Sequence, residues 1–140
     1  MSPSAKSVFV FGVYLSLVGL TLLLIPNFFL TTIGVENTRE VWIRLSGLLL
    51  MALSVYYFAA AKHNIFVIFK VTAVIRCSIL FFFTAFVYLQ MMEPVMLIFA
   101  AIDFAGGFWT WLTMKKEGNW QWVNSYESGI KIKPTEKVPI

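Results

Sequence analysis

Residues 65–89 read IFVIFKVTAVIRCSILFFFTAFVYL. This stretch is long enough to cross a bilayer as one helix, because about 20 apolar residues span a hydrocarbon core of roughly 30 Å. Arg76 lies near its middle, about 16 Å from its start at a rise of ~1.5 Å per residue. A cation at this depth is costly unless it has a partner. The stretch therefore predicts a transmembrane helix that carries a buried polar centre.

The composition places the whole chain in the same class. Of its 140 residues, 59% are hydrophobic and only 13% are charged, which is typical of an integral membrane protein of one domain. The formal charge of +4 arises from basic residues at the ends and in one short loop. That placement suits membrane orientation and argues against nucleic-acid binding. The single cysteine, Cys77, excludes an internal disulfide.

Three further apolar runs accompany the central stretch. Together they predict an all-α fold, a four-helix transmembrane bundle within 1–116, with spans at about 8–25, 41–61, 65–89 and 95–114 and a short polar C-terminal tail at 117–140. A signal peptide is the alternative for the first run, but the run is long for one and no small-x-small cleavage site follows it. Gly12, Ser16 and Gly19 form a stripe of small residues there, which predicts close helix packing. Residues 27–40 are expected to form a loop.

The third span has two unlike faces on a helical wheel. Its polar arc, expected to face the bundle, holds Lys70, Thr72, Ala73, Arg76, Cys77 and Thr84. The opposite arc, expected to face lipid, holds Val67, Val71, Val74, Phe81 and Phe82.

Lysine and arginine positions predict the orientation. Lys6, Lys62 and Lys115 fall beside the spans on one side, whereas Arg39 and Arg44 fall on the other, together with several glutamates. Because cytoplasmic loops carry an excess of Lys and Arg, both termini are expected in the cytoplasm. The chain is thus predicted to be a multi-pass protein of the cell inner membrane, surrounded by membrane lipids.

Asp103, in the fourth span, is the expected partner of Arg76. It lies about 16 Å from Met114 at the end of that span, which is the same depth as Arg76. A bidentate guanidinium–carboxylate bond would satisfy most of both groups. One interpretation is a structural ion pair that fixes the helix arrangement, and the other is a polar site for a ligand headgroup or a proton. Thr72 and Thr110 share the faces of this predicted polar centre.

Other polar and aromatic residues are expected to anchor the chain. Arg44 and Lys70 lie near enough to the span ends to extend to the lipid headgroups. Trp42, Trp109 and Trp111 are typical of the membrane interface. The tail has too little apolar content to fold alone. Its aromatic residues are predicted to dock on partner membrane subunits, and they are Trp120, Trp122 and Tyr126.

The sequence offers little to support catalysis. His63 is the only histidine, which excludes a bis-histidine haem site within the chain. His63 and Cys77 are separated by about 20 Å along one helix, so they predict neither a zinc site nor a nucleophile pair. No glycine-rich phosphate loop is present. We therefore expect a non-enzyme without a metal or cofactor.

Four short runs form a recognisable set. They are Gly19 to Pro26, VWIRLSG at 41–47, Tyr56-Tyr57 with Ala60-Ala61, and Thr72 with Arg76. Together they resemble the small four-helix bacterial membrane proteins of the DoxX-like kind. The resemblance covers most of the membrane part and none of the tail. It implies the four-helix fold and, because that grouping is mostly uncharacterised, says little about function.

Two functions follow as hypotheses. The first is a non-catalytic accessory or structural subunit that docks on a larger membrane complex, motivated by the tail, the stripe of small residues and the absence of a catalytic constellation. The alternative is a membrane binder of a quinone, lipid or similar apolar small molecule around Arg76 and Asp103. A proton or ion pathway is less well supported, because only Lys70 lies near the pair.

Overall fold

The computed structural model describes residues 1–118, and the regular structure in that part is helical. Four helical segments are long and apolar enough to cross a membrane, which confirms the predicted all-α fold with four membrane-spanning helices. The elements are α1 (Pro3–Leu24), α2 (Pro26–Thr32), α3 (Val41–Lys62), α4 (Phe66–Tyr88), the 3-10 turn η1 (Pro94–Met96) and α5 (Leu97–Lys116).

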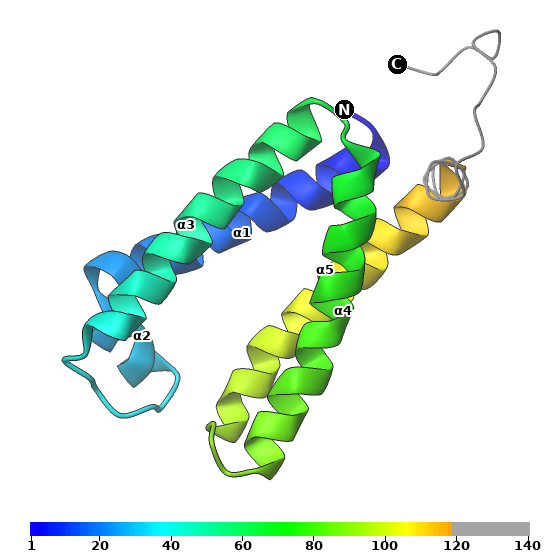
Figure 1. The fold of residues 1–140 in the computed structure, drawn as a ribbon. Coiled ribbons are helices and arrows are strands. Elements are labelled where there is room, and N and C mark those ends of the chain that lie inside the picture. The colour runs from blue at the N-terminus through cyan, green and yellow to red at the C-terminus, as the bar shows by residue number, and fades with distance from the viewer. Residues whose placement is uncertain (119–140) are drawn as a thin grey trace, which may run out of the picture.

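The long helices are arranged as two hairpins. Helix α1 packs along α3, and α4 packs along α5, while α1 also contacts α5 and so joins the hairpins. Figure 1 shows the hairpins meeting near the N-terminus and diverging toward the end where α2 and the α4–α5 turn lie. The buried hydrophobic cluster draws on all four long helices and consists of Ala5, Val8, Phe11, Leu15, Tyr57, Ala60, Ala61, Phe69 and Met114.

The predicted stripe of small residues forms the seam between α1 and α3. A Cβ atom added to Gly19 would lie 2.8 Å from the Gly47 carbonyl oxygen, and one added to Gly47 would lie 2.7 Å from the Gly19 oxygen. Farther along the seam, the Ser16 hydroxyl donates to the Ser54 hydroxyl over 2.9 Å. Small residues let two helix backbones approach this closely, so the packing interpretation of the stripe is confirmed.

Hydrogen bonds from the start of α1 connect the helices at the joined end of the hairpins. Ser2 caps α1, which begins at Pro3 and therefore earlier than the predicted start near residue 8. The Ser4 backbone N–H and hydroxyl donate to the Glu117 carboxylate at 3.0 and 2.5 Å. The Ser2 hydroxyl donates to the side-chain oxygen of Asn64, which occupies the α3–α4 turn with a φ of 49°. Asparagine tolerates this left-handed conformation better than most residues.

The connection between α1 and α3 differs from the expected loop. Pro26 ends α1 and begins α2, because proline fixes φ but has no N–H to continue the preceding helix. The carbonyls of Leu23 and Leu24 accept from the Arg44 guanidinium, the first over 2.6 Å. Arg44 is exposed and caps the end of α1 through these bonds, and its role as an anchor to lipid headgroups stays a prediction.

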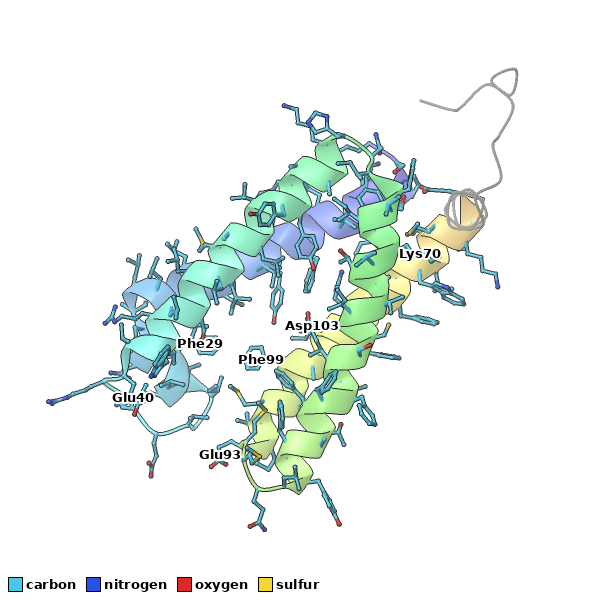
Figure 2. The ribbon with its side chains drawn as sticks, in the orientation of Figure 1. Phe29, Glu40, Lys70, Glu93, Phe99 and Asp103 are labelled. Atoms are coloured by element: carbon cyan, nitrogen blue, oxygen red, sulfur yellow. The ribbon has the colours of Figure 1, made fainter. Side chains whose placement is uncertain are left out.

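Phe29 of α2 reaches the other hairpin at the diverging end. Its ring centroid lies 5.4 Å from that of Phe99 on α5, and Figure 2 shows the two rings between the hairpins. Glu40 and Glu93 lie at this same end, opposite the end that holds the start of α1 and Glu117. Glu40 and Glu93 are therefore at the opposite end of the molecule from Glu117 (Figure 2), and the cytoplasmic orientation of the termini stays a prediction.

The two faces of α4 follow the helical-wheel prediction along most of its length. The five residues expected to face lipid are all exposed: Val67, Val71, Val74, Phe81 and Phe82. On the opposite face Thr72, Ala73 and Arg76 are buried. Thr84, expected on the buried face, is instead exposed and donates to the Leu80 carbonyl of its own helix. Thr84 is exposed because the two hairpins have diverged at its level (Figure 1).

Candidate functional site

Arg76 is the centre of the candidate site. It lies ten residues into α4, about 15 Å along a helix axis that extends for roughly 34 Å. Only 1% of its surface is exposed, and it is the largest fully buried side chain of residues 1–118. Its guanidinium carbon lies 3.3 Å from the centroid of the Phe11 ring on α1. A cation over an aromatic face is attracted by the ring quadrupole, so Phe11 stabilises the charge without accepting a hydrogen bond.

Two glycines on α5 make room for this arginine. A Cβ atom added to Gly106 would clash directly with Nη2 of Arg76. A Cβ atom added to Gly107 would lie 3.1 Å from the Ala73 carbonyl oxygen and 3.1 Å from Cβ of Arg76. The two glycines thus allow α5 to cross α4 at the arginine, with the guanidinium passing over Gly106 toward α1.

The predicted ion pair between Arg76 and Asp103 is not formed. None of the three guanidinium nitrogens has a hydrogen-bond partner among residues 1–118. Asp103 is only half-buried, and Figure 2 shows it on the part of α5 that faces the α1–α3 hairpin. The carboxylate still interacts electrostatically with the arginine. Equal depth brought the residues near each other, but the open side of Gly106 and the Phe11 ring direct the guanidinium elsewhere.

Arg76 forms part of the wall of a pocket between α1, α4 and α5. The pocket has a volume of about 330 Å³ and is lined by Ser7, Val10, Phe11, Tyr14, Arg76, Ile102, Ala105, Gly106 and Trp109. Val10, Ile102 and Trp109 are exposed, whereas Phe11 and Arg76 are buried. In a protein that spans the membrane, the exposed members face hydrocarbon. The pocket therefore opens toward the bilayer and has a cation in its interior.

The two threonines of the predicted polar centre have other partners. Thr72 forms a side-chain hydrogen bond with Tyr57 of α3. Thr110 is fully buried, and its hydroxyl lies 3.0 Å from that of Ser7 on α1. Both threonines thus join the hairpins. Among the expected ligand-site residues, Arg76 alone lines the pocket.

The other residues predicted to anchor the chain differ in their exposure, and their anchoring role stays a prediction. Trp42 and Trp109 are exposed, and Trp111 is half-buried with Lys115 5.2 Å above its ring. Lys70 is half-buried near the joined end (Figure 2). The predicted docking residues Trp120, Trp122 and Tyr126 lie outside the described residues.

Three aromatic residues of the site were missed by the sequence analysis. Tyr14 is half-buried in the pocket, and its ring centroid lies 5.4 Å from that of Phe11. Tyr57 of α3 is buried, and its ring centroid lies 5.7 Å from that of Phe11. The available signal was helical spacing, since Tyr57 shares the small-residue face of α3 with Ser54 and Ala61. Phe11 lies in an apolar run, where nothing in the sequence distinguishes it from its neighbours as a residue of the site.

A larger groove of about 510 Å³ lies along α4 and α5. Its lining is Ala73, Val74, Cys77, Ser78, Phe104, Phe108 and Trp111, with no charged residue. The Ser78 hydroxyl donates to the Val74 carbonyl of its own helix. This groove therefore offers no charged group to a ligand.

The described residues bring a buried cation and a largely apolar pocket together. Across residues 1–118 no group of three or more His, Cys, Asp or Glu side chains is placed to hold a metal ion. The pocket instead combines a buried hydrogen-bond donor with aromatic and aliphatic walls, the usual composition of a small-molecule site. Comparison with known protein families, curated proteins and solved structures gives no match, so the resemblance to the DoxX-like proteins stays a prediction.

Proposed function

We propose that this membrane protein binds an apolar small molecule, such as a quinone or a lipid, between its helix hairpins, and that Arg76 holds the polar end of the ligand. The observation that carries the proposal is Arg76, which lines a pocket open to the bilayer and whose buried guanidinium nitrogens have no hydrogen-bond partner among residues 1–118.

The energetics support a binding role over a structural one. An arginine at the centre of a membrane helix costs about 3 kcal/mol on insertion scales. A structural arginine offsets such a cost through a carboxylate or backbone carbonyls. At Arg76 the five N–H donors are buried, and none has a hydrogen-bond partner among residues 1–118. A ligand that accepts hydrogen bonds there would gain free energy by satisfying them.

The size and shape of the pocket suit a lipophilic ligand. Its volume of about 330 Å³ is at the lower end of the range of small-molecule sites, roughly 300–1,000 Å³. A polar head beside Arg76 would contact Phe11 and Tyr14. A hydrocarbon tail would extend past Val10 and Trp109 into the bilayer, where it is not exposed to water.

Purification in mild detergent tests the proposal. The protein is extracted with organic solvent, and the lipophiles are compared by mass spectrometry between the wild type and Arg76→Met. We expect a stoichiometric lipophile in the wild type that is lost in Arg76→Met. The matched control is Ser78→Ala, two residues away on the exposed face of the same helix, which should retain the ligand.

Two outcomes would contradict the binding role. One is equal lipophile content in the wild type and Arg76→Met. The other is a stoichiometric partner protein whose association depends on Arg76, which would favour the accessory-subunit function. That function was predicted from the tail, the stripe of small residues and the absence of a catalytic constellation, and it remains a proposal.

A further inference from the structure

We infer that the pocket selects an electrically neutral head group that accepts hydrogen bonds, such as a ketone or quinone carbonyl, and discriminates against carboxylate and phosphate heads. The inference rests on the proposed function and specifies the chemical class of ligand for the same site.

The first argument is the position of Asp103. It lies three residues before Gly106 and four before Gly107, both of which contact Arg76. Residues at these spacings share one face of a helix and are separated by about one turn, roughly 5 Å. Asp103 therefore lies about one helical turn from the glycines that make room for Arg76, and it forms no hydrogen bond with the guanidinium.

The second argument is the charge balance that results. Arg76 and Asp103 together contribute no net charge, so an anionic head would gain attraction from one and repulsion from the other. Repulsion between like charges is strong where water is excluded. A neutral carbonyl accepts from the guanidinium and meets no such repulsion. The neighbouring carboxylate thus acts as the element that rejects anions, and specificity depends on such elements as well as on attraction.

The third argument is the remainder of the lining. Apart from Arg76, its members are aromatic, aliphatic, glycine or hydroxyl residues. The Ser7 hydroxyl donates to the Ser4 carbonyl over 2.7 Å and lies 3.0 Å from the Thr110 hydroxyl. Among residues 1–118, Arg76 is the one cation that lines the pocket, and Lys70 lies six residues from it along α4, about 9 Å.

Three probes of equal chain length can separate the possibilities. They are 2-tetradecanone, tetradecanoate and tetradecane, which offer a neutral acceptor, an anion and no polar group. Protein in lipid nanodiscs is equilibrated with an equimolar mixture at about pH 8.5, where a carboxylic acid in water is ionised. The bound fraction is recovered with the protein and quantified by mass spectrometry against empty nanodiscs.

We expect the wild type to enrich the ketone over the carboxylate by about tenfold or more, which corresponds to 1.4 kcal/mol, and over the alkane as well. Asp103→Asn gives the site a net positive charge, and it should shift the ratio toward the carboxylate. Ser78→Ala should leave the ratio unchanged.

The outcomes separate this inference from the proposed function. A wild-type preference for tetradecanoate that depends on Arg76 overturns the neutral-head inference and leaves the binding role intact. An unchanged ratio in folded Asp103→Asn also overturns it, and the wild-type ratio decides the question if that variant does not fold. If no probe is enriched in an Arg76-dependent manner, the binding role fails and the inference fails with it.

Discussion

Replacing Arg76 with methionine should leave the protein at least as stable as the wild type. Methionine has a similar length and no polar atoms to satisfy, so it removes the cost of about 3 kcal/mol for a cation at the membrane centre. It also removes the contact with Phe11 at 3.3 Å, which is worth about 2 kcal/mol when desolvated. The difference predicts a gain of about 1 kcal/mol in the free energy of unfolding. The double variant Arg76→Met/Asp103→Asn also removes the carboxylate that the single variant leaves without its neighbouring cation.

The contrasting expectation for a structural ion pair is a large loss. Removing one member of a buried pair costs about 3–5 kcal/mol, so the two accounts differ by at least 4 kcal/mol. The assay is reversible unfolding in mixed micelles titrated with dodecyl sulfate, followed by circular dichroism. Arg44→Met is the matched control, because it removes a hydrogen bond of 2.6 Å to Leu23 and should destabilise the protein by about 1 kcal/mol or more. A loss of 3 kcal/mol or more in Arg76→Met would refute the reasoning.

Other substitutions test the packing of the two hairpins. Gly47→Ala would place a Cβ atom 2.7 Å from backbone atoms of α1 and should cost about 1–3 kcal/mol in the same titration; an unchanged midpoint would mean that the seam is less close. Glu117→Ala removes two hydrogen bonds from Ser4 and should lower the stability by about 1–2 kcal/mol, whereas Lys116→Ala, on an exposed neighbour, should have little effect. Phe29→Ala removes the contact with Phe99 and should broaden the distance distribution between spin labels on α2 and α5; an unchanged distribution would show that other contacts set the separation there.

Hydropathy and residue spacing predicted the parts of this fold that depend on axial position. Four apolar runs of sufficient length became the four spans, and the stripe through Gly12 and Gly19 became the α1–α3 seam. The short helix after Pro26 was missed, because a seven-residue segment in a polar connection has too little pattern to be distinguished from a loop.

The sequence predicted the depth of the candidate site in the membrane, but not the contacts of its side chains. The rise per residue placed Arg76 and Asp103 at equal depth, but it does not specify the direction of a long flexible side chain. That direction depends on the missing Cβ of Gly106 and on Phe11 from the other hairpin. Such three-body packing has no signature in residue spacing, so the sequence indicated a pair where the structure shows a guanidinium stacked on a ring.

The most direct test of the account is the distance from Arg76 to a bound carbonyl. The chain contains three arginines, Arg39, Arg44 and Arg76, so ¹⁵N-arginine labelling with single substitutions assigns each guanidinium. Solid-state NMR in lipid bilayers with ¹³C-carbonyl 2-tetradecanone then measures the dipolar coupling between the carbonyl carbon and the Arg76 nitrogens. The account predicts a coupling that corresponds to about 4 Å, as expected for a hydrogen bond of roughly 3 Å between nitrogen and oxygen. A bound ketone coupled to Arg44, or to no arginine, would contradict it.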